Sequence, residues 1–176
     1  MSALPHSRVL HKGVSNFSPR QLVKLLATHN PPFYHQFELH PYLQQVAWVE
    51  WQQKHGINVI AYSPLGNMNP TYRDDDDSSS HYPPLLLKNP VIKTIAEERG
   101  CTPAQVVLAW GMRRGTSVIP KSSHPAYIKE NINATDCLLP DEYILQIERL
   151  GKKFVTRFNN PSEGWGVHLF EGLDDA

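Results

Sequence analysis

A parallel α/β fold is the architecture that this sequence predicts, and three observations favour it. Short apolar runs, each ending in a polar loop, alternate along the chain with stretches of helical periodicity. The connections between them are short and rich in turn residues. With 40% of its 176 residues hydrophobic, the chain has enough apolar side chains to bury the core of one domain. Strands that alternate with helices form parallel βαβ units, whose crossovers are almost always right-handed.

The first part of the chain holds three of the expected strands. Ser18 and Gln21 form a capping-box pattern around Pro19, which indicates that a helix begins there. Gly56 is typical of a helix stop and ends the next helical stretch. The patterns predict strands over residues 9–16, 33–39 and 57–62, and helices over residues 19–29 and 43–55.

Residues 66–89 interrupt the alternation and predict a long solvated loop. Its acidic run, Asp74 to Asp77, is typical of like charges kept in water. A divalent-cation site would need further oxygen ligands that the sequence does not identify, so we assign the run no chemistry. After the loop, Thr102 and Gln105 form a second capping-box pattern, which indicates that a helix begins at Pro103. The remaining patterns predict helices over residues 90–99, 125–133 and 140–151, a strand over residues 117–120, and an aperiodic tail from residue 154.

Charge and cysteine content limit the classes of partner and compartment. Lysine plus arginine equals aspartate plus glutamate, so we expect no nucleic-acid partner and no membrane surface partner. Cys101 and Cys137 are too few for a disulfide framework and lie in no zinc-binding spacing, which favours a reduced, cytoplasmic chain without a metal site. We also expect neither a secretion signal nor a membrane span.

Polar side chains gather at the carboxyl ends of the predicted strands, where the functional groups of parallel α/β proteins lie. Neutral hydrogen-bonding groups suit an amide, an aromatic face suits a planar ring, and a lysine beside a serine suits a phosphate. Together they favour a nucleotide with an amide-bearing ring, although no glycine-rich phosphate motif is present. The candidates are Ser15, Asn16, Gln36, Tyr62, Lys121 and Ser122.

Each of these candidates also has a purely structural explanation. Ser15 and Asn16 could form a capping turn before the helix that begins at Pro19, and Tyr62 could simply pack in the core. The sequence leaves both alternatives open.

Four blocks of the sequence resemble the aldo-keto reductases, in the right order and at plausible spacing. The resemblance covers residues 13 to 160 but matches only the second half of that family's (β/α)8 barrel. It therefore implies a partial TIM barrel, with an unmatched segment over residues 1–12, about the last four β/α units over residues 13–153, and a C-terminal tail over residues 154–176. The blocks are Gly13-Val14-Ser15-Asn16-Phe17, Gln36-Phe37-Glu38-Leu39-His40-Pro41-Tyr42, Ala61-Tyr62-Ser63-Pro64-Leu65-Gly66, and Ile119-Pro120-Lys121-Ser122 with Glu130-Asn131.

This resemblance implies a site for NADPH (NADP) without a Rossmann fold. Two departures matter: Tyr127 stands where the family usually has an arginine for the 2′-phosphate, and Asn67 stands where a serine is common. Loss of a fixed cationic fork leaves the preference for NADPH over NADH open. By resemblance, Ser15, Asn16 and Gln36 hold the nicotinamide carboxamide, Tyr62 stacks on the ring, Ser63 and Leu65 line the pyrophosphate, Lys121 and Ser122 meet the 2′-phosphate, and Glu130 and Asn131 contact the adenine.

The resemblance also implies which residues are absent. The family reduces aldehydes and ketones with a catalytic tetrad of Asp, Tyr, Lys and His on the first half of the barrel, and none of these motifs occurs here. We assign no catalytic residue, favour a structural role for His40, and expect a truncated oxidoreductase with no normal activity by itself. The alternatives are a non-catalytic NADP-binding or interaction module that self-associates through exposed sheet edges, and an incomplete product.

The tail resembles the end segment of some family members, where C-terminal loops shape the substrate pocket. Trp165 and Phe170 could line such a pocket, and ordinary packing of the tail is an equal alternative. The carbonyl substrate itself depends on loops from both halves of the barrel.

Overall fold

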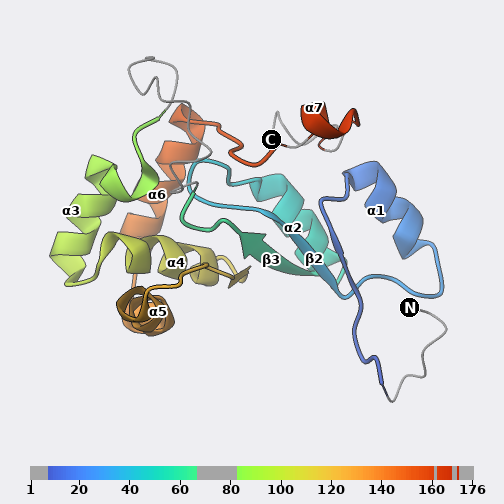
Figure 1. Ribbon diagram of the computed structural model, residues 1–176, viewed down its shortest axis with the longest axis horizontal. Helices are drawn as coiled ribbons and strands as arrows, with labels where there is room; N and C mark the ends of the chain where they lie inside the picture. The colour runs from blue at the N-terminus through green and yellow to red at the C-terminus, as the bar shows by residue number, and fades with distance from the viewer. Residues whose placement is uncertain (1–7, 67–82, 161, 168–169, 171–176) are drawn as a thin grey trace. The chain divides into compact units, whose positions relative to one another are not determined.

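The computed structural model describes residues 8–66, 83–160, 162–167 and 170 (Figure 1). The chain divides into two compact units. Unit 1 comprises Met1–Phe37, Gln45–Ile60 and Asn160–Ala176, and unit 2 comprises Glu38–Gln44 and Ala61–Asn159. The acidic run and Asn67 lie outside the described residues. The predicted boundaries at residues 12 and 153 stay predictions.

One sheet with the strand order β1-β2-β3-β4 confirms the expected strand count. β1 and β2 are parallel, and Ser15 at the end of β1 lies opposite Gln36. β4 is shorter than predicted and ends at Val118, although the Ile119 N–H still donates to the Ala61 carbonyl oxygen at 3.1 Å. The strands are β1 (Gly13–Ser15), β2 (Tyr34–Glu38), β3 (Asn58–Tyr62) and β4 (Ser117–Val118).

In unit 1, a side-chain cap fixes the start of α1, and a backbone conformation fixes the start of α2. At the start of α1, the Gln21 N–H donates to Ser18 Oγ at 3.4 Å and the Ser18 N–H donates to Gln21 Oε1 at 2.9 Å, so the predicted capping box is present. α2 begins later than expected because Gln45 has a φ of 44°, which is incompatible with a helix. The helices are α1 (Pro19–Leu26), α2 (Val46–Lys54) and the short α7 (Ser162–Trp165), which lies in the tail predicted to be aperiodic.

Unit 2 contains a hydrophobic core cluster in which Tyr42, Trp110 and Ile147 are fully or nearly fully buried. Helices α3 and α4 pack against each other and against η2 (Figure 1). The capping box of α4 runs between Thr102 and Gln105, as predicted. The elements are η2 (Leu86–Lys88), α3 (Pro90–Arg99), α4 (Pro103–Arg113), α5 (Pro125–Ile132), η3 (Asn133–Asp136) and α6 (Asp141–Lys153).

Cys101 and Cys137 form a disulfide, so the prediction of a reduced chain is wrong for this structure. Their Cα atoms lie 5.9 Å apart although 36 positions separate them in the sequence. Cys101 immediately precedes the N-cap of α4, and Cys137 immediately follows η3. The contacts of α4 with η3 bring the two cysteines together, and neither their number nor their spacing reveals this proximity.

Two other features are absent from the described part of the chain. No helix in it is long and apolar enough to cross a membrane. Nor do its described residues contain a group of three or more His, Cys, Asp or Glu side chains that could hold a metal ion.

Candidate functional site

Three of the candidate residues lie together in unit 1, where Ser15 ends β1 and Gln36 lies in the middle of β2. Ser15 is the register partner of Gln36, and the Asn16 N–H donates to the Gln36 carbonyl oxygen at 3.0 Å. Ser18, and neither Ser15 nor Asn16, accepts the capping hydrogen bond of α1. Ser15 and Asn16 therefore do not cap α1, and the backbone pairing of β1 with β2 places them beside Gln36.

The side chain of Asn16 presents an unsatisfied acceptor. Its Oδ1 atom is buried and has no hydrogen-bond partner among the described residues. The backbone of Asn16 has a φ of 55°, a left-handed conformation that asparagine tolerates better than most residues. A buried acceptor without a partner costs free energy, and an amide N–H₂ supplied by a ligand would satisfy it. The group therefore fits a carboxamide.

His35 holds this turn in place, and the sequence reasoning did not identify it. The Phe17 N–H donates to His35 Nε2 at 3.0 Å, and His35 Nδ1 lies 2.7 Å from Gln52 Oε1. Nε2 is therefore an acceptor and Nδ1 carries the proton. Burial lowers the pKa of His35 to about 4, against which the hydrogen bond to Gln52 acts only partly, so the ring is neutral near pH 7. The available signal was a histidine in a strand whose other polar residues are Gln36 and Glu38.

At the end of β3, the chain turns sharply in unit 2. Ser63 has a φ of 46°, and the Gly66 N–H donates to the Ser63 carbonyl oxygen at 2.9 Å, which closes the turn. Leu65 packs against the hydrophobic cluster. Tyr62 is half-buried, so the residue is not wholly enclosed in the core. Tyr62, Ser63 and Leu65 thus occupy one tight turn, with part of the Tyr62 surface left accessible.

The candidates that follow β4 differ in what surrounds their side chains. Lys121 is exposed, and Glu130 is engaged within unit 2, where its carboxylate accepts from the Thr102 hydroxyl and its carbonyl from Gln105 Nε2 at 3.2 Å. Ser122 and Asn131 lie together on the wall of a cavity of about 450 Å³, the rest of which is mostly apolar. A cavity with apolar walls and a few polar groups suits a planar heterocycle.

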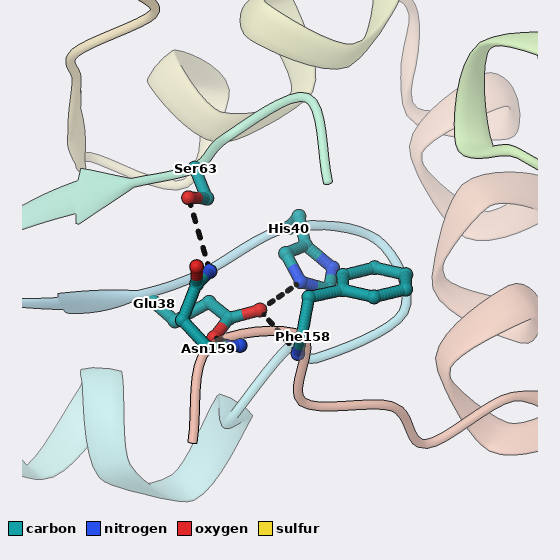
Figure 2. A network of polar contacts seen from close by, with 5 residues as sticks. All are labelled: Glu38, His40, Ser63, Phe158 and Asn159. Carbon is teal, nitrogen blue, oxygen red and sulfur yellow. Dashed lines mark hydrogen bonds and ion pairs between the residues drawn. The ribbon is translucent and has the colours of Figure 1, made fainter. Parts of the chain in front are cut away.

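Glu38, which the sequence analysis left without a role, is the centre of a buried network in unit 2 (Figure 2). Its Oε1 accepts from His40 Nε2 at 2.9 Å and from the Phe158 N–H at 2.8 Å, and its Oε2 accepts from the Asn159 N–H at 2.8 Å. Burial raises the pKa of the Glu38 carboxyl, but His40 and the two backbone N–H groups more than offset this and leave it below its ordinary value. The carboxylate therefore remains ionised inside the protein.

His40 has the structural environment that the sequence favoured. Its ring is fully buried, is paired with Glu38 and packs at a tilt on Phe158, with ring centroids 5.1 Å apart. A group so enclosed has no exposed surface at which to meet a substrate. In the tail of unit 1, Trp165 is 68% exposed whereas Phe170 is buried, so Phe170 packs in the protein and Trp165 does not.

Comparison with known proteins gives a consistent picture. The model of the aldo/keto reductase family matches residues 8–152. An aldo/keto reductase of Synechocystis sp. is 41% identical over 145 residues, which cover 82% of this chain and 43% of the relative. A NAD(P)H-dependent D-xylose reductase of Aspergillus niger is 40% identical over 157 residues, which cover 89% of this chain and 48% of the relative.

Among solved structures, an aldo-keto reductase complexed with NADPH superposes with a TM-score of 0.78 at 29% identity. The match covers 92% of this chain and 47% of that structure. The chain thus spans about half the length of the relatives it matches, and the expectation of a parallel α/β fold that forms part of a barrel is confirmed.

Proposed function

The chain belongs to the aldo/keto reductase family, and from this premise we propose that it provides the NADPH-binding part of an oxidoreductase that acts on small aldehydes and ketones. The observation that carries the proposal is the buried, unpartnered Oδ1 of Asn16, which lies beside Ser15 and Gln36. The names of the similar proteins support it, since one is NAD(P)H-dependent and another was solved with NADPH.

Each candidate has a role in this proposal. Ser15, Asn16 and Gln36 bind the nicotinamide carboxamide through paired neutral hydrogen bonds, which is the chemistry that an amide requires. The exposed part of the Tyr62 ring stacks on the nicotinamide. When bound, NADPH supplies the hydride. The remaining roles are those of Ser63 and Leu65 at the pyrophosphate, Lys121 and Ser122 at the 2′-phosphate, and Glu130 and Asn131 at the adenine.

None of the proposed binding residues is a general acid that could donate a proton to the carbonyl oxygen of a substrate. No motif for the family's Asp, Tyr, Lys and His tetrad occurs in the sequence, and His40 is enclosed by its partners. General acid catalysis contributes about 10²–10⁴-fold to such reactions. We therefore propose that this chain by itself binds cofactor without normal carbonyl reductase turnover, and an NADPH oxidation assay with aldehydes tests that statement.

Titration with NADPH tests the binding proposal directly. NADPH should quench or shift tryptophan emission, and Asn16→Ala should weaken binding because it removes the carboxamide acceptor. Asn30→Ala is the matched control, since Asn30 precedes β2 at the opposite end of the strands and bonds only to Lys12 and Thr28 in the described contacts. A flat titration up to millimolar NADPH would contradict the proposal.

A second candidate function is a non-catalytic module that pairs with another half barrel. Three isoleucines around β4 and α5 favour it, because Ile119, Ile128 and Ile132 are 44%, 43% and 69% exposed. Exposed apolar side chains near a sheet edge promote association. Light scattering tests this candidate: a defined dimer supports it, and a monomer with a cooperative melting transition contradicts it.

We also propose a cytoplasmic location, in keeping with the neutral charge balance and the aldo/keto reductase relatives. The Cys101–Cys137 disulfide argues against it, because disulfides are rare in reducing compartments. Microscopy of a fluorescent fusion tests the location.

A further inference from the structure

We propose that Asn159 and Glu38 are positioning residues that turn the Ser63 hydroxyl toward the pyrophosphate of the cofactor. The inference rests on the proposed function, because it takes Ser63 as a pyrophosphate ligand. It adds Asn159 of the tail and Glu38 at the end of β2, two residues to which the proposed function gives no part in cofactor binding. Figure 2 shows the network, which consists of Glu38, His40, Ser63, Phe158 and Asn159, all of them in unit 2.

Glu38 binds the backbone of the tail through both of its carboxylate oxygens. Its two carboxylate oxygens accept from consecutive backbone N–H groups, those of Phe158 and Asn159, each at 2.8 Å. Two charge-assisted hydrogen bonds to neighbouring peptide groups fix the direction of the chain as well as its position. Glu38 therefore determines where the Asn159 side chain begins.

The side chain of Asn159 contacts Ser63. Asn159 Nδ2 donates to Ser63 Oγ at 3.1 Å (Figure 2). A serine hydroxyl has one hydrogen to donate and two lone pairs to accept with. Because the amide occupies an acceptor position, the hydroxyl hydrogen remains available for another acceptor. An anionic phosphate oxygen is the acceptor for which a hydroxyl donor is best suited.

The network that surrounds Ser63 is anchored at the ends of two strands. Ser63 lies in a left-handed backbone conformation in the turn that follows β3, while Glu38 ends β2. His40, itself fully buried, also binds the Glu38 carboxylate. The network therefore fixes Asn159 from a strand end, and Asn159 in turn fixes the orientation of the Ser63 side chain. Such preorganisation lowers the entropic cost of binding a ligand at Ser63.

A purely structural role for this network predicts a different result. If Asn159 only held the tail, its removal would weaken all ligands equally or lower the melting temperature. If Asn159 acts through Ser63, its removal weakens only ligands that contain the pyrophosphate. The two roles can therefore be separated by ligand and by a double-mutant cycle.

The experiment measures dissociation constants of the full chain for NADPH and for 2′-AMP, which carries the adenine and the 2′-phosphate but no pyrophosphate. Asn159→Ala should weaken NADPH by about 3- to 10-fold, the range expected for one hydrogen bond, and leave 2′-AMP unchanged. In a Ser63→Ala background, Asn159→Ala should have no further effect. Asn160→Ala is the matched control, since its side chain accepts from the Ser162 N–H in unit 1.

Glu38→Gln should show the same ligand dependence, and if it fails to fold, Asn159→Ala carries the test alone. Equal NADPH affinity in Asn159→Ala and Asn160→Ala, or full additivity with Ser63→Ala, would overturn this inference while the proposed function stands. Absence of NADPH binding by the unmodified chain would overturn both.

Discussion

The backbone N–H of Phe17 is bound to Nε2 of His35, at 3.0 Å, and this bond ties the turn after β1 to the neighbouring strand. The opposite ring nitrogen lies 2.7 Å from Gln52 Oε1 in α2. One buried imidazole thus joins a strand, a helix and the turn that carries Asn16. The stability of unit 1 and the geometry of the proposed carboxamide site depend on the same side chain.

Replacement of His35 should therefore be costly. His35→Ala leaves the Phe17 N–H and Gln52 Oε1 without the partners that His35 gives them and opens a cavity in the core. We expect a loss of about 2–4 kcal/mol in the free energy of unfolding and weaker NADPH binding. Urea denaturation measures the first effect. His29→Ala, at an exposed position, is the control and should be neutral; equal stability of the two variants would contradict the prediction.

The buried, neutral His35 should also make the stability of the protein depend on pH. The pKa of His35 is about 4 in the folded protein, against an ordinary histidine value of 6.5, so the unfolded chain binds a proton in this interval that the folded chain does not. Stability is then complete above pH 6.5 and falls as the pH decreases toward 4, by roughly 3 kcal/mol in all. Glu38 adds a loss only below pH 4.5, because its pKa is lowered from that value.

Urea titrations between pH 7 and pH 5 isolate the histidine effect from that of Glu38. The parent chain should lose stability across this range, and His35→Ala should show a shallower dependence. Parallel curves for the two proteins would mean that His35 is not the group responsible.

How far the sequence predicts the fold depends on how local each interaction is. The capping boxes at Ser18 and Thr102 involve residues three positions apart, and both are predicted correctly. The Glu38 network joins residues 120 and 121 positions apart, so no local pattern could reveal it. β4 spans only two residues, so the apolar pattern of residues 117–120 overstates the length of that strand.

The candidate site shows the same limit. Alternation of strands and helices predicts parallel strands, and the parallel pairing of β1 with β2 brings Ser15 and Asn16 beside Gln36. Which side chains orient them depends on tertiary contacts such as that of His35 with Gln52. The cysteine pair escapes prediction for the same reason, since its bond depends on how α4 and η3 pack.

Reduction of the disulfide should lower the stability of unit 2. The bond closes a loop between residues separated by 36 positions, and loops of this size contribute about 3–4 kcal/mol through the entropy of the unfolded chain. Thermal unfolding with and without dithiothreitol measures the effect. A Cys101→Ser, Cys137→Ser double variant is the control, because it should be insensitive to the reductant. An unchanged melting temperature of the parent chain under reduction would contradict the prediction.

Restoring an arginine at position 127 should change cofactor preference. Tyr127 is 58% exposed on α5 and packs on His124, so a longer cationic side chain can be accommodated there. Tyr127→Arg should tighten NADPH by about tenfold through charge-assisted bonds to the 2′-phosphate and leave NADH unchanged. Paired titrations with the two cofactors measure this, with Tyr127→Gln as the uncharged control. Equal gains for both cofactors would refute a 2′-phosphate contact at this position.

Glu38 binds main-chain N–H groups, and these are common to all amino acids except proline. The two hydrogen bonds themselves are therefore indifferent to side-chain identity at positions 158 and 159, whereas the Phe158 ring packs on His40 and the Asn159 amide contacts Ser63. A combinatorial library that varies the tail to seek new substrates can keep this anchor if Phe158 and Asn159 are held constant. The protein thus offers a fixed attachment point for the chain from which a diversified segment can start.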